Sequence, residues 1–237
     1  MITLKNFTIG FKGKVLLTDI ETSFADGALT ALIGRNGSGK STLLKAICGL
    51  NNNYHGEILI EEVNIRNLSP IQLSHKISFV HTQRPRISNM KCKDIVALGR
   101  TPYTGWSGKL NNKDKKIVME SLNMVGMSEY ADRRLDSLSD GECQKIMIAR
   151  AIAQDTEIIL LDEPTSFLDL PTRYDLINLL KKLTIEKKKT IIYSTHELEI
   201  ALKKSDFIAL FDSPHLINLP VEEMKTSDHI SRLFPIY

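Results

Sequence analysis

The side chains best suited to chemistry lie in one glycine-rich stretch, which reads Gly34-Arg35-Asn36-Gly37-Ser38-Gly39-Lys40-Ser41-Thr42. It matches every fixed position of the phosphate-binding pattern G-x-x-x-x-G-K-[ST]. Its glycines allow backbone N–H groups to turn inward around an anion, where a Cβ would interfere. We expect the phosphates to meet a helix N-terminus, Lys40 to reach the β- and γ-phosphates, and the Ser41 hydroxyl to ligate Mg²⁺. The stretch therefore predicts a nucleoside triphosphate site.

A second chemical element is the pair of carboxylates that ends an apolar run, Ile158-Ile159-Leu160-Leu161-Asp162-Glu163. Charge at the tip of a buried strand is costly unless a cation or hydrogen bonds compensate it, and Mg²⁺ bound with ATP is such a cation. We expect Asp162 to hold the metal's coordination shell through water and Glu163 to polarise the water that attacks the γ-phosphate. The pair alone would be weak support, but together with the phosphate loop it indicates nucleotide hydrolysis.

A histidine at a strand end and a capped helix start fit the same chemistry. Ser194-Thr195-His196 ends another strand, where a residue that senses the γ-phosphate would be placed, and we assign that role to His196. Leu138-Ser139-Asp140-Gly141-Glu142 opens a helix with a capping box formed by Ser139 and Glu142. The box explains the start of the helix, but not its position shortly before the strand that carries the carboxylates.

These residues need a scaffold of strands and helices, and the sequence alternates between the two. Apolar runs predict strands, and helical spacing of apolar residues predicts the helices between them. Such alternation indicates a mainly parallel sheet with helices on both faces and with ligand at the carboxyl ends of the strands. The expected strands are Leu29–Ile33, Gly56–Ile60, Ile77–Val80, Glu157–Leu161, Thr190–Ser194 and Asp206–Phe211, and the expected helices include Leu43–Ile47, Leu170–Ile185 and Leu198–Lys204.

Two regions depart from this alternation. Residues 1 to about 23 read as antiparallel strands split by the turn Gly10-Phe11-Lys12-Gly13, whereas residues 84–137 are helical and amphipathic with two loops. We expect one α/β domain over residues 1–237. Its parts are a catalytic core of residues 1–83 and 151–212 with an antiparallel β subdomain at the N-terminus, an inserted α-helical subdomain of residues 84–150, and a short helical tail of residues 213–237.

Composition narrows the class of protein. Charged residues make up 25% of the chain and the formal net charge is +3. Because this balance includes no basic stripe, we do not expect a nucleic acid as a partner. The apolar runs are strand-sized, so we expect no membrane span, and the first residues lack the pattern of a secretory signal. Cys48, Cys92 and Cys143 are odd in number and lack C-x-x-C spacing, which argues against a disulfide framework or a zinc site and favours a reduced cytoplasm.

Taken together, these motifs resemble the nucleotide-binding subunits of ATP-binding cassette (ABC) proteins. The phosphate loop is similar to the Walker A loop, residues 138–142 to the LSGGQ signature, and residues 158–163 to Walker B. Ser166-Phe167-Leu168-Asp169 is similar to the D-loop, whose Asp169 would join the nucleotide site, and His196 is similar to the switch histidine. The resemblance covers about residues 1 to 212, and the signature is its most specific part. It implies a P-loop NTPase (RecA-like) core that hydrolyses ATP with Mg²⁺.

Two more positions follow from the resemblance. Phe11 matches the aromatic position that stacks on adenine, where Tyr is commoner and Phe keeps the π face. The alternative is a core Phe at a strand end. Gln83 resembles the Q-loop glutamine, which contacts Mg²⁺ and links the core to the helical subdomain. The approach Phe79–Gln83 has one residue more than usual, which leaves the register of Gln83 open by one.

The signature departs from the family pattern, because Asp140 and Glu142 replace Gly and Gln. In the family this loop crosses a dimer interface and meets the γ-phosphate held by the other subunit. Carboxylates that faced the phosphate would repel it, so we hypothesise that Asp140 and Glu142 turn away, with Glu142 capping its own helix. Ser139 and Gly141 would keep the phosphate role. One phosphate loop and one signature per chain then imply a homodimer with C2 symmetry.

Residues 96–106, Val96-Ala97-Leu98-Gly99-Arg100-Thr101-Pro102-Tyr103-Thr104-Gly105-Trp106, resemble the start of the helical subdomain in ATPases that serve import of iron chelates (siderophores, haem) or cobalamin. The alternative is a loop whose Tyr103 and Trp106 pack on the subdomain core. The resemblance implies a peripheral ATPase at the cytoplasmic face of the inner membrane, with separate permease subunits and, indirectly, a substrate-binding protein as partners. The competing class is a soluble ABC ATPase such as an iron–sulfur assembly scaffold. A P-loop kinase or GTPase would leave the signature unexplained.

Overall fold

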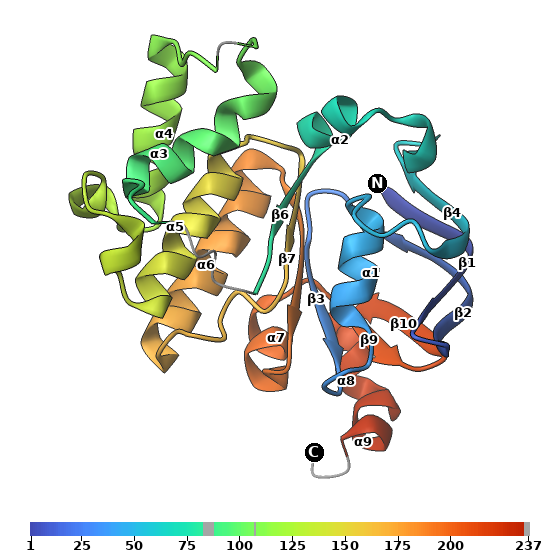
Figure 1. Ribbon diagram of the computed structural model, residues 1–237. Helices are drawn as coiled ribbons and strands as arrows, with labels where there is room; N and C mark the ends of the chain where they lie inside the picture. Colours follow the sequence, from blue (N-terminus) through green and yellow to red (C-terminus); the bar gives the residue numbers. More distant parts are fainter. Residues whose placement is uncertain (83–87, 107, 235–237) are drawn as a thin grey trace.

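The computed structural model describes residues 1–82, 88–106 and 108–234, which form two sheets and a group of helices at one side (Figure 1). A central sheet runs through the molecule, and an antiparallel sheet covers one of its faces. A helical subdomain, built mainly from residues 92–153, lies beyond one edge of the central sheet. The predicted α/β class, the mainly parallel sheet and the antiparallel N-terminal part are confirmed.

The central sheet is buried on both faces. Residues of its strand β3 alternate between two apolar cores, since Ala31 and Ile33 face one and Leu32 faces the other. Burial on both faces explains why these strands read as continuous apolar runs. The β9-β3-β8-β7-β6 part is parallel, and β10 is antiparallel to β9. In the described chain the order across the sheet is β10 (His215–Pro220), β9 (Phe207–Asp212), β3 (Leu29–Gly34), β8 (Thr190–Thr195), β7 (Ile158–Leu161) and β6 (Ile77–Val80).

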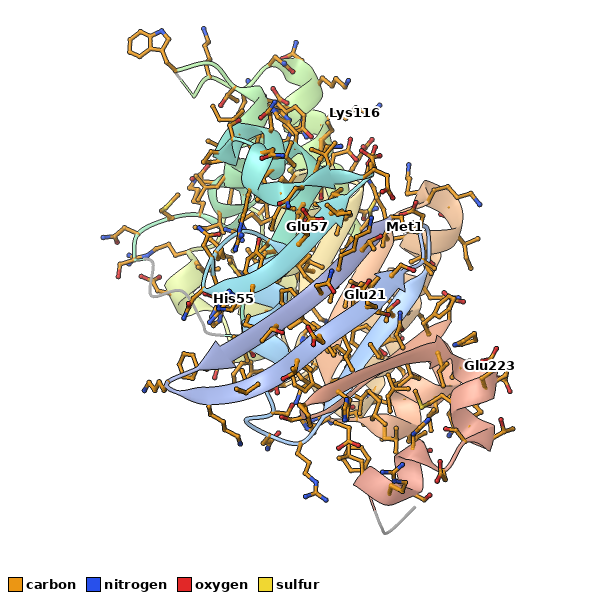
Figure 2. The ribbon with its side chains drawn as sticks, turned by 90° about the vertical axis from the view of Figure 1, so that its right-hand side faces the viewer. Met1, Glu21, His55, Glu57, Lys116 and Glu223 are labelled. Atoms are coloured by element: carbon orange, nitrogen blue, oxygen red, sulfur yellow. The ribbon has the colours of Figure 1, made fainter. Side chains whose placement is uncertain are left out.

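The antiparallel sheet holds helix α1 (Lys40–Ile47) against the central sheet. Buried side chains alternate along its first strand, and these join Leu43 and Ile47 of α1 in one apolar core. Its outer face is polar, with Glu21, His55 and Glu57 exposed (Figure 2). The strands pair in the order β2 (Lys14–Phe24), β1 (Ile2–Phe11), β4 (Tyr54–Ile60) and β5 (Val63–Asn64).

Capping side chains set where several helices begin. Ser69, Asn111 and Ser139 form capping boxes at the starts of α2 (Pro70–Lys76), α4 (Asn112–Met124) and α5 (Asp140–Ala153), and Asp169 caps α6 (Leu170–Lys187). Further helices are α3 (Cys92–Ala97), α7 (Leu198–Lys204), α8 (Val221–Thr226) and α9 (His229–Leu233), with the 3₁₀ helices η1 (Ile65–Asn67), η2 (Leu98–Tyr103), η3 (Ser128–Tyr130) and η4 (Leu135–Ser137). In the part of the chain that the structure describes, no helix combines the length and the apolar character that a membrane span requires.

A buried ion pair organises the helical subdomain. Arg100 Nε donates to Asp114 Oδ1 at 3.0 Å, and Arg100 Nη1 donates to the carbonyl oxygen of Ala153 at 2.8 Å, which ties η2, α4 and α5 together. The Tyr103 ring lies 3.9 Å from the guanidinium carbon of Arg100. Trp106, by contrast, is fully exposed. The alternative in which both aromatic residues of this loop pack on the subdomain core is therefore wrong for Trp106, while Tyr103 contacts Arg100 and remains 41% exposed.

The C-terminal residues differ from the expected helical tail. Residues 215–220 form β10, which extends the central sheet beyond β9, and α8 and α9 follow it. Its sequence, His-Leu-Ile-Asn-Leu-Pro, lacks the strict alternation of apolar and polar residues that identifies a half-buried strand. Its stability comes from the open edge of β9, which supplies the backbone hydrogen bonds and is not visible in the local sequence.

Candidate nucleotide-binding site

The phosphate loop lies between β3 and α1, at the carboxyl end of the central sheet. Gly39 precedes α1 with a φ of 116°, which favours glycine, and a Cβ there would lie 2.9 Å from Leu16 Cδ1. A Cβ on Gly34 would lie 2.9 Å from the backbone oxygen of Phe211. The packing around the loop therefore requires glycine at both positions. The loop leaves the N-terminus of α1 accessible to an anion.

Lys40 is buried at the start of α1, and its ammonium group turns back onto the loop. Nζ donates to the carbonyl oxygens of Gly34 at 2.8 Å and of Arg35 at 3.2 Å. Burial lowers the pKa of Lys40, while the negative charges of Glu163 and Asp162 act in the opposite direction. The two carboxylates therefore help to keep a cation beside the phosphate loop.

Asp162 is the buried acceptor at the centre of the site. Its Oδ1 accepts hydrogen bonds from the hydroxyl groups of Ser41 and Ser194, each at 2.8 Å. Carboxylate and hydroxyl oxygens are ligands that Mg²⁺ prefers, so Ser41 and Asp162 fit a site for this ion. Within residues 1–82, 88–106 and 108–234, no group of three or more His, Cys, Asp or Glu side chains could hold a metal ion. A Mg²⁺ ion here would therefore need phosphate and water oxygens as further ligands.

Glu163 has a left-handed backbone, with a φ of 47°, which is uncommon for a residue other than glycine. Such a conformation costs on the order of 1–3 kcal/mol and has to be held by its surroundings. The Glu163 N–H donates to Ser194 Oγ at 2.8 Å, and the Ser166 hydroxyl is shared between the Glu163 carbonyl oxygen at 3.0 Å and Glu163 Oε2 at 3.1 Å. The role of Ser194 was not predicted, because its hydroxyl meets Asp162 and Glu163 only through the pairing of β8 with β7.

A cavity of about 270 Å³ brings together much of the predicted site. Its lining includes Phe11, residues 37–42 and Glu163. Phe11 is 55% exposed, so the alternative of a core Phe is wrong. An adjoining cavity of about 280 Å³ adds Arg35 and Asn36. Lys14 lines both cavities and was not predicted, although it is a cation directly after the turn that contains Phe11.

Ser139, Gly141 and Asp169 do not line this cavity. A Cβ on Gly141 would lie 3.1 Å from the carbonyl oxygen of Phe167, so the signature loop contacts the D-loop instead. Asp169 accepts the N–H of Thr172 at 3.2 Å, and the Thr172 hydroxyl and N–H lower the pKa of Asp169. These residues form a second group, apart from the phosphate loop of the same chain.

The other predicted residues have separate positions. Glu142 caps its own helix as hypothesised, since its Oε2 accepts the Ser139 N–H at 2.9 Å. His196 is exposed after β8 and does not line the cavity of about 270 Å³. Gln83 lies outside the described residues.

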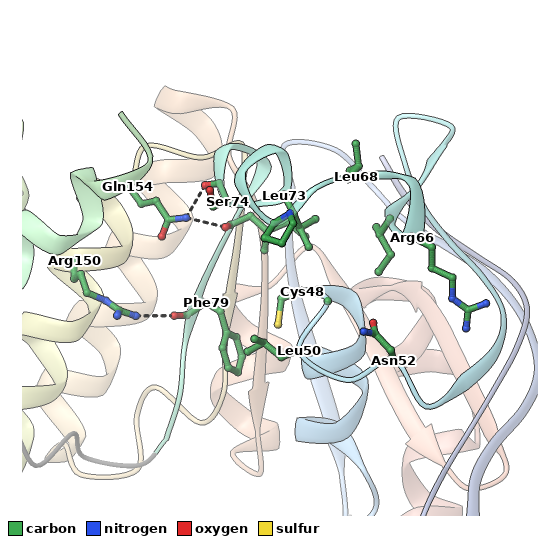
Figure 3. A pocket seen from close by; sticks show the side chains of 14 residues that line it. Cys48, Leu50, Asn52, Arg66, Leu68, Leu73, Ser74, Phe79, Arg150 and Gln154 are labelled. Atoms are coloured by element: carbon green, nitrogen blue, oxygen red, sulfur yellow. Dashed lines mark hydrogen bonds between the residues drawn. The ribbon is translucent and has the colours of Figure 1, made fainter. Parts of the chain in front are cut away.

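A larger cavity, of about 730 Å³, lies where the helical subdomain meets the core (Figure 3). Arg150 Nη2 of α5 donates to the Phe79 carbonyl oxygen of β6 at 3.1 Å, and Gln154 Nε2 donates to the Ser74 carbonyl oxygen at 2.7 Å. These bonds join α5 to β6 and α2. Of the predicted nucleotide-site residues that the structure describes, none lines this cavity.

The sequence pattern of the ABC transporter family matches residues 17–166. An uncharacterized ABC transporter ATP-binding protein of Methanocaldococcus jannaschii is 39% identical over 92% of this chain and 75% of that protein. The iron(3+)-hydroxamate import ATP-binding protein of Bacillus subtilis is 32% identical over 99% of this chain and 88% of that protein. The petrobactin import ATP-binding protein of Bacillus subtilis is 33% identical over 99% of this chain and 92% of that protein.

Solved structures share the fold. A chain of an inward-facing ABC transporter, assigned to the metal-chelate type, matches with a TM-score of 0.86 at 27% identity, over 99% of this chain and 88% of that chain. An ATP-binding cassette solved as a dimer in a post-hydrolysis state, bound to ADP and Pi, matches with a TM-score of 0.82 at 29% identity. That match covers 93% of this chain and 99% of the other.

Proposed function

This chain belongs to the ABC transporter family and is an ATPase, and from that premise we propose that it energises the import of an iron chelate (siderophore or haem) or of cobalamin. The relatives named for iron(3+)-hydroxamate and petrobactin import support this cargo class, as do residues 96–106. The observation that best supports ATP hydrolysis at this site is the 2.8 Å hydrogen bond between Ser41 and Asp162. It joins the phosphate loop to the strand end that bears Glu163.

We assign ATP to the cavity of about 270 Å³. The exposed ring of Phe11 stacks on adenine, and the loop N–H groups with the N-terminus of α1 bind the phosphates. Lys40 leaves the carbonyl oxygens of the loop for the β- and γ-phosphates. When Mg²⁺ is bound with ATP, it neutralises phosphate charge. Ser41 and Asp162 would hold that ion, with Gln83 as the further ligand that the family resemblance implies.

Glu163 is the proposed general base for hydrolysis. Its side chain lines the cavity, the Ser166 hydroxyl lies within hydrogen-bond distance of both its carbonyl oxygen and its carboxylate, and Ser194 accepts its N–H. In this position Glu163 can polarise the water that attacks the γ-phosphate. His196 directly follows the neighbouring strand β8 and is exposed, so its ring can turn towards the γ-phosphate and sense it.

Ser139, Gly141 and Asp169 would complete the site from a second copy of the chain. They lie where the signature loop contacts the D-loop, away from the cavity of their own chain. We propose that two chains pair with C2 symmetry, so that each chain offers these residues to the ATP that its partner holds. The dimeric cassette among the solved relatives supports this arrangement.

The cavity of about 730 Å³ is the proposed docking site for a cytoplasmic loop of a separate permease subunit. Its wall combines apolar Leu50 and Leu73 with basic Arg66 and Arg150, which suits an amphipathic segment that carries a carboxylate. Because α5 and β6 meet there, closure of the dimer would move a segment bound in it. The chain would then be peripheral at the cytoplasmic face of the membrane, while the permease and a substrate-binding protein select the cargo.

Co-purification from solubilised membranes tests this proposal. A protein with many membrane spans should be recovered with the tagged chain. Leu50→Asp should reduce its recovery, whereas Ile185→Asp should not, because Ile185 is similarly exposed but lies on α6 outside the cavity. Recovery of a soluble assembly partner instead would favour the alternative, an ABC ATPase that is not coupled to transport. Uptake assays with labelled siderophore, haem and cobalamin then distinguish the cargo.

A further inference from the structure

The Ser139 hydroxyl makes one hydrogen bond more than its helix start requires. In a capping box the hydroxyl accepts an N–H three residues on, and the carboxylate accepts the N–H of the capping residue. Both bonds are present, from the Glu142 N–H to Ser139 Oγ at 3.3 Å and from the Ser139 N–H to Glu142 Oε2 at 2.9 Å. In addition, the Ser139 hydroxyl donates to the same Oε2 at 2.7 Å. A serine hydroxyl has a single hydrogen, and here Glu142 accepts it.

This additional hydrogen bond is strong because its acceptor is charged. The N–H and the hydroxyl of Ser139 lower the pKa of Glu142, so the carboxylate remains ionised at neutral pH. Hydrogen bonds to an ionised acceptor are roughly twice as strong as those between neutral groups. A neutral amide at position 142 could keep the capping box, but it would hold the hydroxyl less firmly.

We propose that Glu142 is a positioning residue that holds the Ser139 hydroxyl on its own chain and thereby restrains assembly of the two-chain ATP site. The inference rests on the proposed function, in which Ser139 donates to the γ-phosphate held by a second copy. One hydrogen cannot be donated to the carboxylate and to that phosphate at the same time. Closure of the dimer therefore requires the hydroxyl to change acceptor, which raises the ATP concentration needed for closure.

Asp140 offers a matched comparison for the effect of charge. It lies in the first turn of the same helix, is exposed and carries the same charge as Glu142, but it is not part of the capping box. Asp140→Asn and Glu142→Gln each remove one negative charge near the N-terminus of α5. Glu142→Gln in addition weakens the acceptor of the Ser139 hydroxyl.

ATP-driven dimerisation of the full chain provides the test, measured by light scattering in a Glu163→Gln background that slows hydrolysis. We expect Glu142→Gln to lower the ATP concentration at half-maximal dimerisation by about tenfold, because the competing acceptor is weaker. Asp140→Asn should lower it by about twofold at most, since exposed charges are screened. The thermal stability of the isolated chain should change little, because Gln retains the capping box.

A double-mutant arm separates the hydroxyl from the charge. Ser139→Ala alone should weaken dimerisation, and adding Glu142→Gln to it should bring no gain. The proposal is overturned if Glu142→Gln has no effect in the chain that keeps Ser139, if its gain persists without the hydroxyl, or if Asp140→Asn gives the same gain. Normal dimerisation of Ser139→Ala would instead show that the proposed phosphate role of Ser139 is itself wrong.

Discussion

The Ser194 hydroxyl is fully buried and connects the two carboxylate residues of the site. It donates to Asp162 Oδ1 and accepts the Glu163 N–H, while the same Oδ1 accepts the Ser41 hydroxyl. One side chain therefore positions both the carboxylate proposed to face Mg²⁺ and the backbone that directs the proposed base. Neighbours that orient metal ligands in this way change affinity or activity about 10- to 100-fold when they are mutated.

We expect Ser194→Ala to lower kcat about 10- to 100-fold while ATP affinity changes little, because the phosphate loop is unaltered. Thr156→Val is the control. Thr156 is also buried, and its hydroxyl donates to the Ile158 carbonyl oxygen at 2.8 Å, before β7 and outside the cavity of about 270 Å³. Both variants should lose roughly 1 kcal/mol of unfolding free energy. ATPase assays and nucleotide titrations check this, and equal loss of turnover in both variants would contradict it.

Glu163→Gln should separate ATP binding from hydrolysis. An amide can keep the hydrogen bond from Ser166 but cannot accept a proton, so turnover should fall by about 10²–10⁴-fold. ATP binding should be retained, and the dimer should persist in ATP, which size-exclusion chromatography and phosphate-release assays can measure. Glu157→Gln changes an exposed carboxylate before β7 and should leave turnover unaltered. A Glu163→Gln chain that stays monomeric and hydrolyses ATP normally would refute the assignment of the base.

Among the elements, those whose signals are contiguous in the sequence could be predicted. The strand, glycine loop and helix that form the phosphate site follow one another, and the helix start at Ser139 carries its own capping box. The role of Ser194 could not be predicted, because it depends on the pairing of β7 with β8 across the intervening α6. The strand at residues 215–220 likewise depends on the edge of β9. Both features arise from contacts between segments that local patterns do not specify.

The helical subdomain depends on a close approach between η2 and α5 at Gly99. A Cβ there would lie 2.3 Å from the Arg150 carbonyl oxygen, which belongs to a helix backbone and cannot easily shift. Gly99→Ala should therefore lower the free energy of unfolding by about 1–3 kcal/mol. Gly105→Ala is the control in the same subdomain, since a Cβ there would meet nothing within 4 Å. Urea unfolding of both variants checks this, and losses of equal size would show that the close contact does not limit stability.

For the whole molecule, the arrangement of the two residue groups matters most. The phosphate loop, Asp162 and Glu163 share one region, whereas Ser139 and the D-loop form another. The proposed requirement for two chains follows from the count of motifs, because the sequence has one phosphate loop and one signature. The hold of Glu142 on the Ser139 hydroxyl was not predictable, since a capping box in sequence does not specify where the hydroxyl hydrogen points.

Mixing two inactive variants tests this division of the site between chains. Lys40→Ala removes the cation of the phosphate loop and Ser139→Ala removes the signature hydroxyl, so each pure dimer has two defective sites. In a mixed dimer, one site combines the intact Lys40 of one chain with the intact Ser139 of the other. Random pairing makes half of the dimers mixed, so an equimolar mixture should recover up to about one quarter of the wild-type ATPase rate.

Mixing Lys40→Ala with Glu163→Gln should recover nothing, because both changes lie in the half-site that one chain provides. Recovery in that control, or none in the first mixture, would contradict the two-chain site.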